Sequence, residues 1–387
     1  MKKWKAFNRW LHLWLGLISG IVVFIVSITG AIFVFNKEIS AVLEPWRFVE
    51  AQDNAVVPPS VLLDSAMTYV PGVHPTGLTY DGKEEAAAVG FWSEVEGNQV
   101  FTAVFLNPYT GEFIQKRSPV GNEFNFFQFI NNGHRTLWLP QHIGTRVVGI
   151  ATLIFSVLLI SGLINWWPRT FKNGFWKNSF RIAWRAPSMR IFYDLHNVLG
   201  FYVLIFAFAI ATTGLVWSFE WFGNGLYYLT SGGKQKLEHH HPHSNPAHGP
   251  IADNDSIPAI DRAFYKALAQ EPDPQRIYIS PYPEDEEDAI EIVFYRDKGK
   301  FYSHNEYFFD QYTVEPLRID GDRYNEAGFG DKLEMMNYDI HTGAILGLPG
   351  KILAFFISMI CASLPITGFV MWQKKRRITK MQRRSVR

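Results

Sequence analysis

The sequence of 387 residues contains one cysteine, Cys361, which lies inside a long apolar run. A single cysteine excludes an intrachain disulfide, an iron–sulfur cluster held by several cysteines, and a haem attached through a C-x-x-C-H motif. No glycine-rich nucleotide motif follows an expected strand, so neither a Walker loop nor a dinucleotide-binding fingerprint is present. Any redox cofactor must therefore be held by histidine.

Charged residues are missing from four long runs. The runs contain 23, 21, 22 and 21 residues and cover 13–35, 147–167, 198–219 and 352–372. At a rise of about 1.5 Å per residue, each helix would cross a hydrocarbon core of about 30 Å. The pattern predicts a membrane protein with a four-helix transmembrane bundle, and it excludes a soluble enzyme. The first run is too long for the apolar part of a signal peptide, which has about 7 to 15 residues.

Basic residues gather in three short segments beside these runs. Four precede the first run, six lie in 169–190 and eight lie in 374–387, against a single acidic residue, Asp194. The positive-inside rule places these segments, and both termini, in the cytoplasm. Both long segments between the runs are then expected on the outer side. Topology accounts for the basic residues, so no nucleic-acid partner is expected.

Two sets of residues recur along the sequence at constant offsets of 184 and 206 residues. The first set is His12, Gly16 and Thr29-Gly30, repeated as His196, Gly200 and Thr213-Gly214; the second is Gly144, Ser161-Gly162 and Trp166, repeated as Gly350, Thr367-Gly368 and Trp372. The repeats predict an internal duplication of a helix–domain–helix unit in parallel orientation. Close helix packing would explain the small residues, but it does not explain the histidines.

Each of the two outer segments is expected to form a small α+β unit. The first offers a helix over 60–69, strands over 76–81, 86–93 and 100–106, and a turn over 107–111; the second offers a helix over 257–268, strands over 276–280, 289–295 and 307–309, and a turn over 310–313. The expected domain organisation is a first transmembrane helix with its cytoplasmic N-terminus (1–35), outer domain 1 (36–133), transmembrane helix 2 (134–167), a basic loop (168–194), transmembrane helix 3 (195–219), outer domain 2 (220–340), transmembrane helix 4 (341–372) and a basic tail (373–387).

Four of the twelve histidines lie at the ends of the apolar runs. His12 and His196 belong to the cytoplasmic end, and His134 and His341 to the outer end. Two imidazoles on facing helices hold a haem iron axially without any cysteine. The residues therefore predict two b-type haems, with these four histidines as axial ligands of the iron. Basic residues at suitable depth for the propionates are Arg9, Arg135, Arg146, Arg190 and Lys351.

Three alternatives for the histidines stay open. A terminal histidine can serve only as an interfacial anchor or helix cap. His142 has a depth that also suits the outer site, and it is kept as a reserve ligand. The tract from His239 to His243, with His248, is a candidate metal site of a purely compositional kind. Other intramembrane metals are less expected, because no run contains a carboxylate.

The combination of these motifs resembles the PepSY-associated transmembrane family. The residues that carry the resemblance are Trp10-Leu-His12 with Thr29-Gly30, His134-Arg-Thr-Leu137, Asp194-Leu-His-Asn197 and Ile340-His-Thr-Gly343. Asn107-Pro-Tyr-Thr-Gly-Glu112 is similar to the closing turn of a PepSY domain, whereas Asp310-Gln-Tyr-Thr-Val-Glu315 lacks the glycine. The resemblance implies PepSY-like domains in the periplasm, a bacterial inner-membrane location and the same four histidines as haem ligands. Family members include iron-regulated inner-membrane proteins and di-haem ferrisiderophore reductases, the ferrioxamine reductase type among them.

The expected function is thus an oxidoreductase of iron uptake. Electrons from an unidentified cytoplasmic or quinol donor would cross between the haems and reduce a ferric siderophore, which releases Fe(II) in the periplasm. One competing interpretation is a PepSY membrane protein that regulates a periplasmic peptidase and has no redox role. Another is a quinone-linked haem oxidoreductase. The expected partners are membrane lipid, the siderophore and the electron donor.

Overall fold

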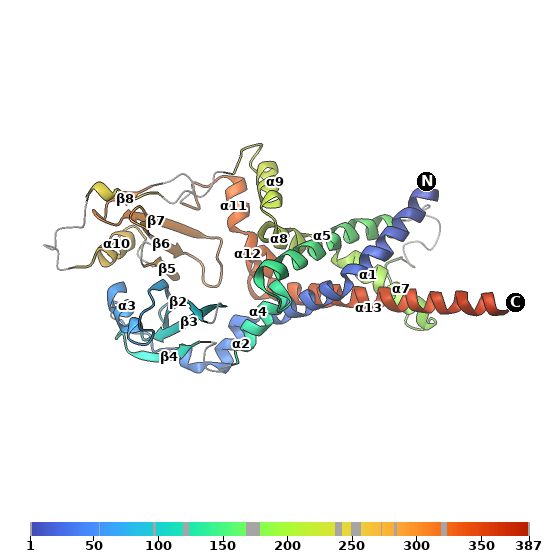
Figure 1. Ribbon diagram of the computed structural model, residues 1–387, viewed down its shortest axis with the longest axis horizontal. Helices are drawn as coiled ribbons and strands as arrows, with labels where there is room; N and C mark the ends of the chain where they lie inside the picture. The colour runs from blue at the N-terminus through green and yellow to red at the C-terminus, as the bar shows by residue number, and fades with distance from the viewer. Residues whose placement is uncertain are drawn as a thin grey trace. The chain divides into compact units, whose positions relative to one another are not determined.

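The chain forms two compact units, a helical unit and a sheet unit, between which it passes several times (Figure 1). The helical unit comprises Met1–Asn36, Phe126–Leu226 and Tyr338–Arg387, and the sheet unit comprises Lys37–Asn125 and Tyr227–Asn337. This computed structural model describes residues 2–53, 55–95, 98–118, 124–167, 179–236, 242–248, 257–271, 273–281, 285–318 and 323–385.

Four long helices build the helical unit: α1 (Lys2–Phe33), α5 (Gln141–Trp166), α8 (Gly200–Ser218) and α13 (Gly347–Ser385). Within the described residues, four helical segments are long and apolar enough to cross a membrane: Lys3–Phe33, Gln141–Trp166, Ser188–Ser218 and Ala344–Thr379. The helix α1 packs against α5 and α13, and α8 packs against the same two helices, which closes a ring of four. The expectation of four spanning helices is confirmed.

Short helices precede three of the long ones. They are α4 (Phe126–Thr136) before α5, α7 (Ser188–Asp194) with the π-helical turn Leu195–Leu199 before α8, and α12 (Asn337–Thr342) with the 3-10 turn Ala344–Leu346 before α13. The sequence predicts a transmembrane helix over 134–167 that is interrupted by Pro140, and the structure divides this segment into α4 and α5 just before and at that proline. Leu137 and Trp138 adopt the left-handed region, with φ of 54° and 58°, and Pro140 precedes the first turn of α5. Consecutive left-handed residues reverse the chain, so α4 cannot continue into α5.

The sheet unit contains one antiparallel sheet of eight strands in the order β4-β3-β2-β1-β5-β6-β7-β8. The strands are β1 (Pro75–Tyr80), β2 (Ala87–Val95), β3 (Asn98–Leu106), β4 (Phe113–Arg117), β5 (Arg276–Ser280), β6 (Ala289–Tyr295), β7 (His304–Asp310) and β8 (Pro316–Leu317). Strands β1 and β5 pair through Leu78 with Ile279 and Thr79 with Tyr278. The two segments between the membrane helices therefore share one sheet.

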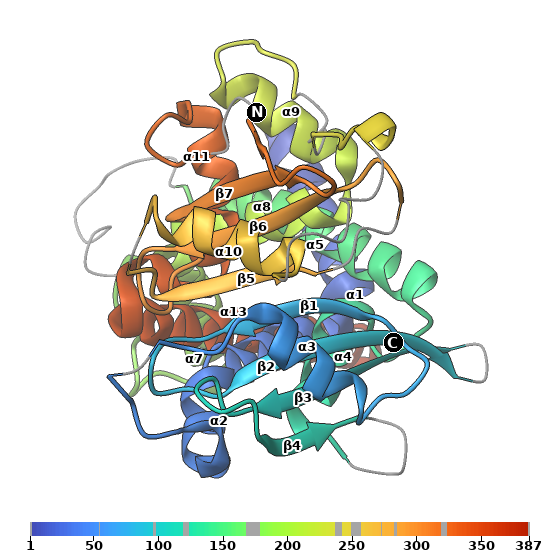
Figure 2. The ribbon, with the colours of Figure 1, turned by 90° about the vertical axis from the view of Figure 1, so that its left-hand side faces the viewer.

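Helices α3 (Pro59–Met67) and α10 (Ala259–Leu268) lie on the same face of this sheet (Figure 2). Alternate side chains of the six inner strands, β1 to β3 and β5 to β7, point to this face and form one apolar core with the helices, with Leu62 and Phe264 almost fully buried. At the start of the helices, the main-chain N–H and the hydroxyl of Ser60 both donate to the Asp261 carboxylate, at 2.9 and 2.6 Å. The other helices among the described residues are α2 (Asn36–Leu43), α9 (Glu220–Thr230) and α11 (Phe329–Met335), with 3-10 turns at Pro45–Arg47 and Pro246–His248.

Two turns in the sheet unit share their main-chain hydrogen bonds but differ in residues. The N–H of Gly111 donates to the Asn107 carbonyl oxygen at 2.8 Å, and that of Val314 donates to the Asp310 carbonyl oxygen at 2.9 Å. In the first, Asn107 accepts from the N–H of Tyr109, and Gly111 adopts a φ of 73°. In the second, the Asp310 carboxylate accepts from the N–H groups of Tyr312 and Thr313, and Val314 adopts a φ of 58°. The turn expected over 310–313 thus forms without a glycine.

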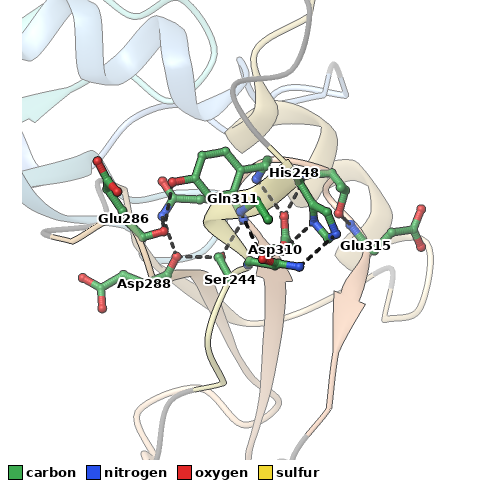
Figure 3. A network of polar contacts seen from close by, with 11 residues as sticks. Ser244, His248, Glu286, Asp288, Asp310, Gln311 and Glu315 are labelled. Carbon is green, nitrogen blue, oxygen red and sulfur yellow. Dashed lines mark hydrogen bonds and ion pairs between the residues drawn. The ribbon is translucent and has the colours of Figure 1, made fainter.

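The second turn lies in a polar network (Figure 3). The N–H of Asn245 donates to the Asp310 carboxylate at 2.9 Å, and the His248 ring lies 3.6 Å from it. The Gln311 amide donates to the carbonyl oxygens of Asp285, Glu286 and Asp288, while the Ser244 hydroxyl donates to the last of these. These bonds hold the turn in the conformation that Val314 alone would disfavour.

Candidate functional site

The inner pair of histidines is brought together inside the helical unit. His12 lies on α1, and His196 lies in the π-helical turn before α8. Their ring centroids are 6.2 Å apart, and the ring planes are inclined by 86°. π-Helical turns are rare and occur frequently at functional sites.

The outer pair has similar spacing. His134 lies on α4 and His341 lies on α12, and their ring centroids are 6.0 Å apart at an inclination of 64°. Val26, whose carbonyl oxygen accepts from His134, lies 14 residues after His12 on α1. At about 1.5 Å per residue the two pairs are separated by about 21 Å along this helix. The pairs thus lie near opposite ends of the helical ring.

Each imidazole is held through Nδ1 by a neighbouring helix. Nδ1 of His134 lies 2.9 Å from the Val26 carbonyl oxygen, and Nδ1 of His12 lies 2.8 Å from the Ser161 hydroxyl. In the other half of the chain each ring has two contacts. Nδ1 of His196 lies 3.1 Å from the Leu364 carbonyl oxygen and 3.0 Å from the Thr367 hydroxyl. Nδ1 of His341 lies 3.0 Å from both the Ile210 carbonyl oxygen and the Thr213 hydroxyl.

These partners determine the tautomer of each ring. A carbonyl oxygen can only accept, so Nδ1 of His134, His196 and His341 must carry the hydrogen. The Ser161 hydroxyl donates to the Leu158 carbonyl oxygen at 3.1 Å and therefore accepts from His12. Within the described residues Nε2 of none of the four rings is hydrogen-bonded. All four rings therefore have a free Nε2 lone pair, which is the state that binds a metal.

A glycine lies against the edge of each imidazole. A Cβ atom at Gly30 would be 2.8 Å from Cε1 of His134, and one at Gly214 would be 3.3 Å from Cε1 of His341. Gly162 and Gly368 have the same relation to His12 and His196, both at 3.4 Å. Each of these glycines follows the serine or threonine of a repeated dipeptide. Close helix packing was the explanation offered by the sequence for these dipeptides. In the structure their glycines leave space for the edges of the histidine rings.

Another pair of repeated glycines, Gly144 and Gly350, allows the end of each short outer helix to lie directly against the long helix that follows it. A Cβ atom at Gly144 would be 2.2 Å from the carbonyl oxygen of Thr136, and one at Gly350 would be 2.1 Å from that of Gly343. In each half a glycine early in the long helix thus admits the end of the short helix that carries the outer histidine.

The inner pair borders a cavity of about 590 Å³ between the long helices. Gly16 and Gly200 line it, and a Cβ atom at Gly16 would meet no atom within 4 Å. Arg9 and Lys375 bring positive charge to its lining. Its size falls within the range of about 300–1,000 Å³ that is typical of small-molecule sites.

Other residues that the sequence suggested lie elsewhere. His142 is exposed on the first turn of α5, and among the described residues no hydrogen bond or ring contact joins it to His134 or His341. Arg190 forms an ion pair of 2.8 Å with the buried Asp194. His239, His240 and His241 lie outside the described residues, whereas His243 and His248 lie near Glu287 and Asp310, at 3.7 and 3.6 Å. Among the described residues no three His, Cys, Asp or Glu side chains gather in a group suited to a metal ion.

Sequence reasoning missed a polar contact beside the inner pair. Asn8 is only 5% exposed and donates to the Ser161 carbonyl oxygen at 3.0 Å and to the Asn165 side chain at 2.9 Å. It lies one turn before His12 and fixes α1 against α5. Its spacing of four residues from the histidine was the available signal, but the partners on α5 are visible only in the fold.

Comparison with families of known proteins matches residues 9–375 to the family described as the PepSY-associated TM region. The match includes all four candidate ligand histidines and most of each long helix. A comparison with curated proteins found no match.

Proposed function

Because the chain belongs to the PepSY-associated TM family, we propose that it is a membrane oxidoreductase with two b-type haems that reduces a ferric siderophore on the outer side of the membrane. In this proposal His12 and His196 hold the inner haem, and His134 and His341 hold the outer one. The observation that carries it is the arrangement of four imidazoles as two pairs, each ring with a bonded Nδ1 and a free Nε2.

The spacing of the rings supports axial ligation. A metal about 2.0 Å from each of two imidazole nitrogens that point toward each other would put the ring centroids about 6 Å apart. The observed separations are 6.2 and 6.0 Å. A haem requires only two ligands from the protein, which is what each pair supplies.

The residues around the inner pair also suit a flat macrocycle with two carboxylates. The cavity of about 590 Å³ passes beside Gly16, where a side chain would otherwise project. Arg9 and Lys375 provide cationic partners for propionates. A bound b-type haem would supply one-electron oxidation and reduction of its iron. The protein orients the rings and holds their Nδ1 protons.

The distribution of charge supports the direction of transfer. The basic segments favour cytoplasmic termini, which puts the inner pair near the cytoplasm and the sheet unit on the periplasmic side of a bacterial inner membrane.

We further infer that the matched contacts of the histidines arose by internal duplication. Siderophores hold the hard Fe(III) ion with oxygen ligands, and reduction to Fe(II) weakens that complex.

Mixing experiments test the proposed function. The full-length protein in detergent micelles is reduced with dithionite, freed of the excess and mixed with a ferric hydroxamate in a stopped-flow instrument. The reduced haem bands should decay as ferrozine traps a matching amount of Fe(II). A His134→Ala variant, which keeps the inner ligands, should react much more slowly. Haems that stay reduced with every ferric chelate but oxidise rapidly with a quinone would contradict the proposal.

Labelling at single cysteines tests the orientation. In a Cys361→Ser background, a cysteine in place of the exposed Glu84 should react with an impermeant maleimide added to intact spheroplasts, whereas one in place of the exposed Arg185 should not. Reaction at Arg185→Cys in intact spheroplasts would invert the assigned topology.

A further inference from the structure

The four imidazoles differ in the group that accepts their Nδ1 hydrogen. His134, His196 and His341 each donate to a main-chain carbonyl oxygen, at 2.9, 3.1 and 3.0 Å. His12 donates at 2.8 Å to the Ser161 hydroxyl, which is its only acceptor among the described residues. The carbonyl oxygen at the matched place on α5, that of Leu158, accepts from the Ser161 hydroxyl at 3.1 Å. The matched carbonyl oxygens of Leu364 and Ile210 also accept from the hydroxyl of their own dipeptide, but they accept from the imidazole as well.

This difference bears on the electronic character of the ligands. A carbonyl acceptor withdraws the Nδ1 hydrogen more strongly than a hydroxyl does, and the imidazole becomes a stronger electron donor at Nε2. A stronger donor stabilises Fe(III) and lowers the reduction potential, because hydrogen bonds to the axial ligands tune that potential. The inner pair contains one ring bonded only to a hydroxyl, whereas both rings of the outer pair are bonded to carbonyls.

On the basis of the proposed function, we propose that Ser161 is a positioning residue that sets the reduction potential of the inner haem and that this potential lies above that of the outer haem. Two cations, Arg9 and Lys375, line the inner cavity and favour the reduced, less positive state of a haem bound there. Arg135, next to His134, is the corresponding cation of the outer pair. An electron would then rest on the inner haem, and a membrane potential that is positive outside would draw it outward.

A matched set of variants separates this role from simple packing. Thr29 occupies the same place in its dipeptide as Ser161, but its hydroxyl donates to the Ile25 and Val26 carbonyl oxygens, and within the part of the chain that the structure describes it forms no hydrogen bond with an imidazole. Thr29→Ala is therefore the control for removal of a hydroxyl from this motif. Ser161→Thr keeps the acceptor and introduces the residue found in the other three dipeptides.

The experiment is an optical redox titration of the haem-loaded, full-length protein, with the inner component identified in His134→Ala. The inner haem should titrate at the higher potential. Ser161→Ala should raise it further and change the ratio of reduced to oxidised inner haem on the order of tenfold, or about 59 mV for one electron. Ser161→Thr should restore the original value, and Thr29→Ala should leave both values unchanged.

Three results would overturn the inference while haem binding stands. They are an inner potential below the outer one in the unmodified protein, a shift in Ser161→Ala no larger than that in Thr29→Ala, and a downward shift in Ser161→Ala. The last would mean that His12 turns to the freed Leu158 carbonyl oxygen. Purified protein without any haem would instead contradict the proposed function and, with it, the basis of this inference.

Discussion

After the short outer helix of the first half, Leu137 and Trp138 form the turn, whereas the second half uses Gly343 and Gly347. All four residues have positive φ, between 54° and 77°. In the first half the strain is compensated by the Trp138 ring, which stacks on Phe129 with its centroid at 4.9 Å and donates from its indole N–H to the carbonyl oxygen of that residue at 2.8 Å. Two different sets of residues thus present an outer histidine in the same way.

The same relation holds at the two turns of the sheet unit, where Gly111 and Val314 occupy matched places. Val314 is fully buried in the core, so its apolar contacts offset a conformation that costs a β-branched residue about 1–2 kcal/mol. The halves agree in the geometry of their backbones and rings and differ in the residues that produce it. Substitutions at matched positions therefore show which half depends more strongly on a given contact.

Substitution of the histidines is expected to have the largest effect on haem content. Each pair consists of one ring from each half of the chain, so the loss of either ring removes one of the two axial ligands. His12→Ala and His196→Ala should each remove the inner haem, and His134→Ala and His341→Ala should each remove the outer one, since a single imidazole holds a b-type haem poorly. Haem content and reduced spectra of the four purified variants measure this. His142→Ala is the control and should keep both haems. Loss of the outer haem in His142→Ala with retention in His134→Ala would refute the ligand assignment.

Gly30→Ala is the next test, with Gly214→Ala as its matched control in the other half. The added methyl group would lie 2.8 Å from Cε1 of His134 in the first case and 3.3 Å from Cε1 of His341 in the second. Gly30→Ala should displace the ring and cause substantial loss of the outer haem, while Gly214→Ala should retain most of it. Equal outer-haem content in the two variants would show that the space beside these glycines does not determine the position of the ligand rings.

The pairing of the histidines was predictable from sequence. His12 and His196 follow the constant offset of 184 residues, and His134 and His341 lie 10 and 9 residues before the matched Gly144 and Gly350. Their acceptors were not predictable, since Val26 and Ser161 lie on other helices and a carbonyl group is invisible in a sequence pattern. Pro140 predicted an interruption between α4 and α5, but the left-handed turn just before it was not predicted. Left-handed residues in turns are usually glycine or asparagine, and Leu137 and Trp138 are neither.

Gly111→Ala measures the cost of a left-handed residue at the first turn. The variant should destabilise the turn by about 1–2 kcal/mol, because alanine has a Cβ atom and the glycine has a φ of 73°. Amide hydrogen exchange of the turn in the full-length protein reports the change in local opening free energy. Gly233→Ala, at a φ of 93° in another loop, is the control for effects outside this turn. Unchanged exchange at the turn in Gly111→Ala would contradict the argument from backbone strain.

The smallest effect concerns pH at the second turn. Burial raises the pKa of Asp310, but the N–H groups of Asn245, Thr313 and Tyr312 lower it more, so its pKa lies below the ordinary value. Because its pKa is lowered, the ionised Asp310 stabilises the turn fully at pH values above the ordinary aspartate pKa of about 3.9. This stabilisation is lost as the pH falls from that value through the lowered pKa. Asn107 has no such charge, so the first turn is the internal control. Amide exchange should show acid-induced opening at the second turn only, and Asp310→Asn should abolish the pH dependence.

The strands show which parts of the sheet the local sequence pattern could predict. The bounds expected for 276–280 and 289–295 agree with β5 and β6, because apolar and polar residues alternate there and loops flank both. The edge strands β4 and β8 were missed, since they have 5 and 2 residues and bury little. The pairing of β1 with β5 joins residues about 200 positions apart, and no local pattern specifies such a register.

An absorbance spectrum of the unmodified, purified protein, oxidised and then reduced with dithionite, tests the central claim most directly when it is combined with quantitative haem extraction. Two pairs of imidazoles with free Nε2 atoms predict bis-histidine b-type spectra and about two extractable haems per chain. The preparation should be made from cells supplied with haem precursor, so that supply does not limit occupancy. A folded protein that shows no haem bands under these conditions would contradict the assignment of His12, His134, His196 and His341 as axial ligands.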